Sequence, residues 1–329
     1  MKNHVHNIIY WLNLILGPLL SLIVIGWAVW FLDWQQVWRE LIGANYGWVL
    51  ITTCSILVTI SLQTGRWQTL FIPRILPFRH LFPALVMGQV ANILAPARAG
   101  DVLRAYIVGK TTGISKARAL GTIALEKLWD MLMLFLFTAG LSFYITLPDL
   151  ILTPVNILMS IIFVGLSLLG VILWQRQRTM QLVTYISTWL GKRFSDRLPI
   201  FAENVFDGFT GLHTPQRIAI TCLWSVLIWL TMGTTNYMLF WAFNLYLAPR
   251  IAFLLLVALR IGVAVPSLPG KIGVFQGICV FVLALFDVPY DIAFSYSLIL
   301  HLITFLPPIL LSAIFGFQLN LQIQEMRSL

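Results

Sequence analysis

Long apolar stretches separated by short polar turns follow one another along the whole chain. The stretches 8–32, 151–174 and 292–316 are each long enough to span a bilayer, because a helix of about 20 apolar residues crosses the hydrocarbon core. The pattern predicts an all-α polytopic integral membrane protein with about six full spans. We expect these spans at 8–32, 47–64, 118–146, 151–174, 217–242 and 292–318.

Two further apolar stretches, 81–97 and 251–286, are interrupted by proline and glycine. The first is short, and if it crossed completely the basic stretch after it would lie on the outer side. We therefore predict two re-entrant, broken helical hairpins, since proline and glycine end helices. The residues expected at the breaks are Pro96 and Gly100 in the first hairpin and Pro266, Pro269, Gly270 and Gly273 in the second.

The order span, broken hairpin, span occurs at 47–146 and again at 217–318. Because the first copy is entered from inside and the second from outside, we predict an inverted repeat within one transmembrane domain, 1–329. Such repeats with discontinuous helices are typical of transporters, and irregular backbone at membrane depth lines a cavity or is buried in protein. The segment 175–216 between the copies is predicted to be a cytoplasmic amphipathic linker.

Composition and charge agree with this interpretation. Of 329 residues 59% are hydrophobic and 10% are charged, whereas soluble domains carry roughly a quarter charged residues. The net charge of +9 might suggest a nucleic-acid partner, but its distribution follows the positive-inside rule and argues against one. Most of the 21 basic residues lie at Lys2, in 65–80, 98–118 and 175–217, and at Arg327. Both termini are therefore predicted on the cytoplasmic side of the inner (plasma) membrane.

The first break carries the sharpest chemical signal. Between Asn92 and Arg104, two guanidinium groups, of Arg98 and Arg104, and the Asp101 carboxylate gather around the expected helix break. A helix N-terminus near Gly100 and arginines that bind in bidentate fashion would suit a phosphate. Alternatively, Arg98 and Asp101 pair with each other to hold the loop while Arg104 extends to the interface.

The span after the first break contains Glu126, Lys127 and Asp130. Ionisable residues facing lipid cost roughly 2.5–3.5 kcal/mol each, so these should face the protein interior. Glu126 and Asp130 share a helix face and Lys127 can reach Asp130, which leaves one acid to pair with Arg98 or Arg104. Proton coupling, a countercharge for a substrate amine and a structural ion-pair network all remain open.

Around the second break, Arg260 and Lys271 flank the sequence Pro-Ser-Leu-Pro-Gly without an acidic neighbour in sequence. They suit a lipid phosphate, or they neutralise the acids of the charged span. Gly273 and Gly277 have the spacing that permits close helix packing, and we favour this structural role. The lone intramembrane His301 is predicted to be a packed, hydrogen-bonded residue rather than a proton relay.

Three stretches, 88–104, 119–130 and 266–277, resemble the lysylphosphatidylglycerol synthase transmembrane family, also called the flippase-like domain family. The resemblance implies a translocator of lipids such as aminoacylated phosphatidylglycerol, and some members are fused to an aminoacyl-transferase domain. The family commonly has an acid after the Pro-Gly turn, where this chain has Gln276. If that acid is a countercharge for a cationic headgroup, its absence disfavours a lysyl-lipid. Relatives associated with glycolipid, polyprenyl-phosphate or hopanoid pathways widen the options.

The predicted function is a lipid flippase or scramblase for an anionic, phosphate-bearing lipid or glycolipid, with no enzymatic activity and no cofactor or metal. The predicted substrate-binding residues are Asn92, Arg98, Asp101, Arg104, Glu126, Lys127, Asp130, Arg260, Lys271 and Gln276. Two alternatives remain: a headgroup-transferring membrane enzyme, and a non-catalytic partner of a synthase or glycosyltransferase that docks through 175–217. A homodimer is also compatible with the sequence. If the predicted charged residues neutralise one another and are inaccessible to lipid, the role of a non-catalytic partner is favoured.

Overall fold

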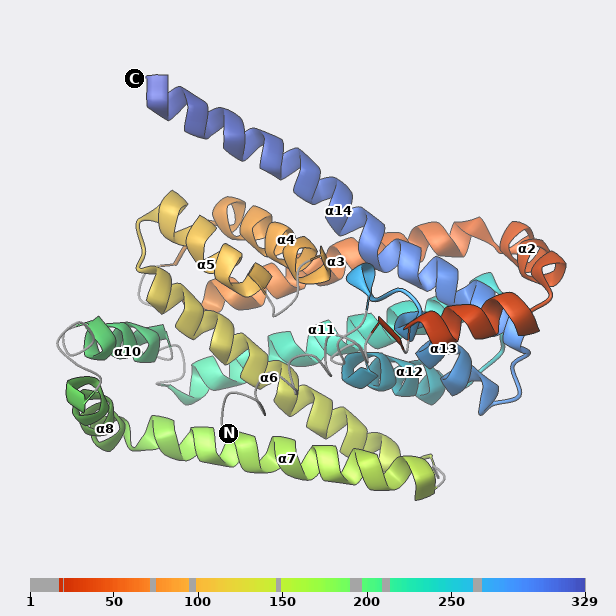
Figure 1. Ribbon diagram of the computed structural model, residues 1–329, viewed down its shortest axis with the longest axis horizontal. Coiled ribbons are helices and arrows are strands. Elements are labelled where there is room, and N and C mark those ends of the chain that lie inside the picture. The colour runs from red at the N-terminus through yellow and green to blue at the C-terminus, as the bar shows by residue number, and fades with distance from the viewer. Residues whose placement is uncertain are drawn as a thin grey trace. The chain divides into compact units, whose positions relative to one another are not determined.

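The protein is all-α wherever its structure is described (Figure 1). A computed structural model describes residues 18–19, 21–71, 75–94, 99–145, 149–189, 197–208, 214–262 and 268–328. All regular secondary structure in these ranges is helical. The predicted fold class is therefore confirmed at the level of an all-helical chain.

Within the described ranges, four stretches of helix are long and apolar enough to cross a membrane by length and composition. They are α3 (Tyr46–Leu70), Val155–Ile172 within α7 (Asp149–Trp174), α11 (Pro215–Ala242) and Tyr290–Phe317 within α14 (Tyr290–Ser328). Each overlaps a predicted span, because the length of an apolar segment is a local property of the chain.

Two more helices correspond to the remaining predicted spans. The 27-residue helix α6 (Lys116–Ser142) covers nearly all of the span expected at 118–146. The apolar helix Ser21–Phe31 is the described part of the span expected at 8–32. The predicted total of about six full spans stays a prediction.

Both interrupted helix pairs are present. The first consists of α4 (Phe78–Leu94) and α5 (Ala99–Thr112). The second consists of α12 (Pro249–Gly262) and α13 (Val274–Ala284), with one turn of 3₁₀ helix, Pro269–Lys271, between them. Among the residues expected at the breaks, Pro96 and Pro266 lie outside the described ranges. Helix, broken pair, helix thus occurs twice along the chain, while the inversion of the second copy stays a prediction.

The turn before α13 depends on backbone conformations that most residues avoid. Gly270, Lys271 and Gly273 have φ angles of 76°, 62° and 86°. Glycine adopts positive φ without a steric penalty, whereas Lys271 lies in the sparsely populated left-handed region for L-residues. Gly270 and Gly273, both predicted at the second break, therefore allow the positive φ angles that this turn requires.

Gly273 and Gly277 bring α13 against the N-terminal helix Ser21–Phe31. A Cβ atom placed on Gly273 would lie 2.6 Å from the Ser21 carbonyl oxygen, and one on Gly277 would lie 3.0 Å from Val24 Cγ2. The first distance is too short for any side chain, so only glycine permits this approach. The predicted close helix packing at Gly273 and Gly277 is confirmed.

The described part of the predicted linker forms helices α8 (Arg176–Trp189) and α10 (Arg197–Gly208). Helix α10 packs on both α8 and α6, and the three lie together in Figure 1. Its contact with α6 is close, because a Cβ atom on Gly208 would lie 2.6 Å from Gly121 Cα. The linker is thus firmly attached to the helix that carries Glu126, Lys127 and Asp130.

The chain divides into two compact units, each with its own apolar core. The first comprises Met1–Thr59, Gln89–Ala99 and Leu230–Leu329, and the second comprises Ile60–Gly88 and Gly100–Trp229. Fully buried side chains include Leu255, Leu283 and Tyr296 in the first unit and Trp67, Leu81 and Leu125 in the second. The second break lies in the first unit, and the charges of α5 and α6 lie in the second.

Candidate functional site

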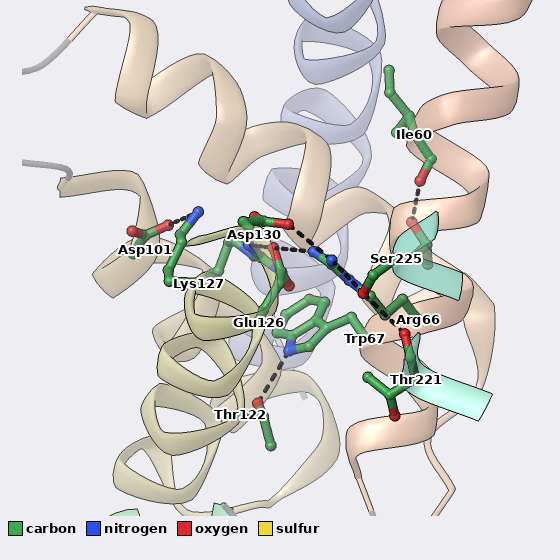
Figure 2. A network of polar contacts seen from close by, with 12 residues as sticks. Ile60, Arg66, Trp67, Asp101, Thr122, Glu126, Lys127, Asp130, Thr221 and Ser225 are labelled. Atoms are coloured by element: carbon green, nitrogen blue, oxygen red, sulfur yellow. Dashed lines mark hydrogen bonds and ion pairs between the residues drawn. The ribbon is translucent and has the colours of Figure 1, made fainter. Parts of the chain in front are cut away.

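Six ionisable side chains from three helices gather in the second unit, and we call them the charge cluster. Figure 2 labels all of them except Arg104. They are Arg66 of α3, Asp101 and Arg104 of α5, and Glu126, Lys127 and Asp130 of α6. Five of the six were predicted as substrate-binding residues from sequence. With three cations and three carboxylates, the formal charges of the cluster balance.

The centre of the charge cluster is a bidentate pair between Arg104 and Glu126. Arg104 Nη1 donates to Glu126 Oε1 at 3.1 Å and Nη2 donates to Oε2 at 2.8 Å. The two side chains are 3% and 6% exposed, and the guanidinium carbon lies 4.0 Å from the centre of the Trp67 ring. A buried carboxylate requires this kind of compensation.

This pair confirms one prediction and corrects another. The expectation that an acid of α6 would pair with an arginine of the first break holds for Glu126 and Arg104. The alternative that Arg104 extends to the interface is wrong, because its side chain is buried and pairs with the Glu126 carboxylate, which is also buried. Arg98, the other arginine considered, lies outside the described residues.

Arg66 is a member of the charge cluster that the sequence interpretation missed. Its Nη1 lies 2.8 Å from Asp130 Oδ1 and donates to Ser225 Oγ at 3.1 Å, and its Nη2 lies 3.8 Å from Glu126 Oε1. The side chain is 1% exposed. The predicted end of this span at residue 64 was therefore wrong, because α3 continues to Leu70.

A signal for Arg66 was present in the sequence. Glu126 and Asp130 lie on one helix face, so a single arginine could neutralise only one of them in an apolar environment. No proline follows the predicted span until Pro73, so nothing local required the helix to end at residue 64. The unneutralised carboxylate and the uninterrupted helix together pointed to Arg66.

The remaining residues form a partly exposed edge of the charge cluster. Lys127 Nζ lies 3.7 Å from Asp101 Oδ1, and these side chains are 30% and 15% exposed. Asp130 is 35% exposed. Lys127 thus pairs with Asp101, whereas the sequence suggested Asp130, which instead contacts Arg66. The charge cluster has a buried core and an accessible edge.

Neutral hydrogen bonds hold the aromatic ring beside Arg104. Trp67 Nε1 donates to Thr122 Oγ1 at 3.1 Å, and Thr122 Oγ1 in turn donates to the Ala119 carbonyl at 2.7 Å. Trp67 is 0% exposed, so its N–H needs this partner. The network in Figure 2 joins α3 to α6 below the ion pairs.

Gly88 makes room for the arginine of the central pair. A Cβ atom at this position of α4 would lie 2.6 Å from Arg104 Cδ and 2.8 Å from the Gly100 carbonyl oxygen. Any larger residue must displace the buried Arg104 side chain or the start of α5. Gly88 belongs to the first stretch that carries the family resemblance, and this contact gives a physical reason for a glycine there.

Other predicted site residues lie at the second break. Gln276 is 6% exposed. Its Oε1 accepts from the Gly273 N–H at 2.8 Å, and its Nε2 lies 2.9 Å from His301 Nδ1. The prediction of a packed, hydrogen-bonded His301 is confirmed. Lys271 is half-buried and Arg260 is exposed.

Asn92 is the remaining predicted residue within the described ranges. It is half-buried in α4, in the part of that helix that belongs to the first unit. The predicted substrate-binding residues are therefore divided between the two units. Five of them form the charge cluster, and a substrate-binding role stays a prediction for all ten.

Comparison with known proteins identifies the family. The family model described as "Lysylphosphatidylglycerol synthase TM region" matches residues 14–312. The chain belongs to this family. It is a multi-pass membrane protein, and the resemblance noted in the sequence is confirmed.

Similar proteins come from archaea. A UPF0104 membrane protein of Methanocaldococcus jannaschii is 25% identical over 227 residues, which cover 68% of this chain and 91% of that protein. A UPF0104 membrane protein of Methanothermobacter thermautotrophicus is 26% identical over 279 residues, covering 78% and 81%. The glycosyltransferase AglD of Haloferax volcanii is 27% identical over 134 residues, covering 40% of this chain and 20% of that protein. No solved structure matches the chain.

Proposed function

We propose that this protein is a lipid translocase, a flippase or scramblase that moves an anionic, phosphate-bearing lipid or glycolipid between the leaflets of the inner membrane. The observation that carries the proposal is the charge cluster with its buried arginines and accessible edge. Six ionisable residues in an apolar membrane protein are costly. A binding role for a charged headgroup gives a reason to keep them in one place.

The exposures within the charge cluster suggest how a phosphate would enter. Lys127 is the most exposed cation and is held by Asp101 at the long distance of 3.7 Å, so it is the natural first contact. Arg66 is held by Asp130, which is 35% exposed and can turn toward water. A phosphate that replaces Asp130 on Arg66 could bind in the bidentate geometry that arginine favours. The buried pair of Arg104 and Glu126 remains intact in this exchange.

The arrangement of helices supports the same proposal. An interrupted pair lies between two long helices twice along the chain, as α3 to α6 and as α11 to α14. We propose that these copies form an inverted repeat, with both termini in the cytoplasm. Such repeats support alternating access to a central site in transporters. Translocation would then require no catalytic residue.

A second candidate is a non-transporting partner of a synthase or glycosyltransferase. It is favoured by the low exposure of the central pair, 3% and 6%, and by the balanced charges of the cluster, which need no ligand. The similarity to part of a glycosyltransferase points the same way. An enzyme that transfers headgroups is less well supported, because a general acid or base must be able to exchange protons with its substrate and Glu126 is held by both oxygens.

Proteoliposomes containing head-labelled lipids test the proposal. The measurement is the rate at which label in the inner leaflet becomes accessible to an external quencher, for a panel of anionic and zwitterionic lipids. We expect the wild type to accelerate an anionic lipid and Lys127→Ala to lower that rate at least tenfold. Lys110→Ala is the matched control, because Lys110 is an exposed lysine at the end of α5 and should leave the rate unchanged.

Two outcomes would decide against translocation. Equal rates in wild-type and protein-free vesicles across the lipid panel would remove the transport function. In that case, retention of a glycosyltransferase or synthase on the purified protein would support the partner role. Equal loss of rate in Lys127→Ala and Lys110→Ala would show that surface charge, rather than the edge of the charge cluster, controls the reaction.

A further inference from the structure

Helix α8 has three distinct faces. Arg176, Met180, Val183 and Ser187 follow one another at helical spacing and are half-buried or buried. Arg176 also pairs with Asp207 of α10 at 3.0 Å, so this face packs on α10. A second face carries only uncharged polar residues, namely Gln177, Gln181, Thr184 and Thr188.

The third face of α8 is an apolar stripe that is exposed within the described part of the chain. Leu182, Tyr185, Ile186 and Trp189 have the spacing i, i+3, i+4, i+7, which aligns side chains along one side of a helix. Their exposed fractions are 58%, 74%, 41% and 84%. Four large apolar residues in register are unlike the scattered apolar residues of ordinary surfaces.

The position of α8 relative to α7 identifies what covers this stripe. In α7 the segment Val155–Ile172 has the hydropathy of a membrane span, and only 7% of this segment is buried among the described residues, which is typical of a helix surrounded by lipid. That helix ends at Trp174, which is 85% exposed, and α8 begins at Arg176. Figure 1 shows α8 turning away from the axis of α7. Helix α8 therefore starts where the chain leaves the hydrocarbon core.

We infer that α8 lies in the surface of the bilayer leaflet at which α7 ends, with the stripe Leu182, Tyr185, Ile186 and Trp189 inserted among the lipids. Tyr and Trp are suited to this depth because their rings are apolar and their polar atoms reach the headgroups. Arg178 is exposed beside the stripe, where its long side chain can reach the headgroup phosphates.

The packing of α10 fixes the rotation of α8 about its own axis. Helix α10 holds the first face of α8 and is itself held against α6 at Gly121 and Gly208. The open hollow of about 630 Å³ between α8 and α10 is lined by Glu203 of α10, by Gln177, Gln181 and Thr184 of the polar face of α8, and by Arg176 and Met180 of its first face. The apolar and polar faces of α8 are thus presented in different, fixed directions.

Site-specific labelling in proteoliposomes tests this inference without reference to translocation. Single cysteines at Tyr185, Trp189, Gln181 and Thr188 would carry an environment-sensitive fluorophore, in a protein with Cys54→Ala and Cys222→Ala. Cys279 is 0% exposed and is retained. Thr188 and Trp189 are a matched pair, adjacent in sequence but on different faces. Thermal unfolding of each variant confirms that the fold is intact.

We expect lipids that carry a spin label near the headgroup to quench Tyr185→Cys and Trp189→Cys at least twofold more than Gln181→Cys and Thr188→Cys. Aqueous iodide should show the reverse order. Equal quenching at all four positions would overturn the inference. Stronger iodide quenching at positions 185 and 189 would also overturn it and would leave the stripe as a docking face for a soluble protein.

Discussion

At the first interrupted helix pair, the contacts that define the geometry are ionic. Arg104 of α5 holds Glu126 of α6 at 2.8 and 3.1 Å, and Arg66 of α3 holds Asp130 at 2.8 Å. At the second pair, the defining contacts come from glycine backbone and an amide. Gly273 adopts a φ of 86°, and the Gln276 side chain bonds its N–H and the imidazole of His301.

The two regions should differ in how much stability they lose when a residue is substituted. Removing one member of a buried ion pair leaves an uncompensated charge, and this costs far more than the pair contributes relative to apolar residues. Removing a neutral hydrogen bond costs about 0.5–1.5 kcal/mol, with a further penalty for a buried group left unsatisfied. The buried core of the charge cluster should therefore be intolerant of single changes and tolerant of paired ones, whereas its exposed edge and the second break should lose stability in small steps.

The largest effect is expected from Arg104→Met. It leaves Glu126 buried without its bidentate partner and should lower the free energy of unfolding by about 3–5 kcal/mol. The double variant Arg104→Met with Glu126→Met removes both charges and should recover most of that loss. Equilibrium unfolding in detergent micelles measures both. A double variant no more stable than the single one would mean that packing, not charge, dominates at this pair.

Gly88→Ala tests the space beside Arg104 rather than its charge. The added methyl group would crowd the Arg104 side chain and the Gly100 carbonyl, and overpacking of this kind costs about 1–3 kcal/mol. Gly140→Ala in α6 is the matched control, because a Cβ atom there meets nothing within 4 Å. Thermal unfolding should separate the two variants, with the control equal to or slightly above the wild type.

Gln276→Ala addresses the second break. It removes the acceptor for the Gly273 N–H and the contact with His301, and we expect a loss of about 1–2 kcal/mol. Gln276→Glu should recover part of this loss as the neutral acid, whose carbonyl oxygen still accepts from the Gly273 N–H without burying an unpaired charge. The same unfolding measurement applies. A loss as large as that of Arg104→Met would contradict the contrast between the two regions.

Lys127→Ala should have the smallest effect on stability. Exposed ion pairs contribute about 0–1 kcal/mol, and Lys127 is 30% exposed with its partner at 3.7 Å. The free energy of unfolding should therefore remain close to that of Lys110→Ala, while the proposed translocation rate falls only in Lys127→Ala. A large loss of stability would assign Lys127 to the structural core of the charge cluster.

Much of the fold follows from local properties of the chain. Apolar length located α6, α7, α11 and α14 within a few residues of their expected starts, and Pro269, Gly270 and Gly273 marked the second interruption, whereas Gly100 lies within α5. The pairing of Arg104 with Glu126 was also within reach of sequence reasoning. A carboxylate in an apolar helix must find a cation, and few cations were near enough to be considered.

The sequence by itself determined the all-helical membrane fold, the two broken helices and the requirement that the charges of α6 be neutralised. Only the tertiary structure decided that Arg66 supplies the second cation, that Lys127 pairs with Asp101, and that Gly88 must be a glycine. The physical reason is that apolar length and turn chemistry act within one segment. The partner of a side chain depends instead on the depth and rotation of several helices, which are set only when those helices pack together.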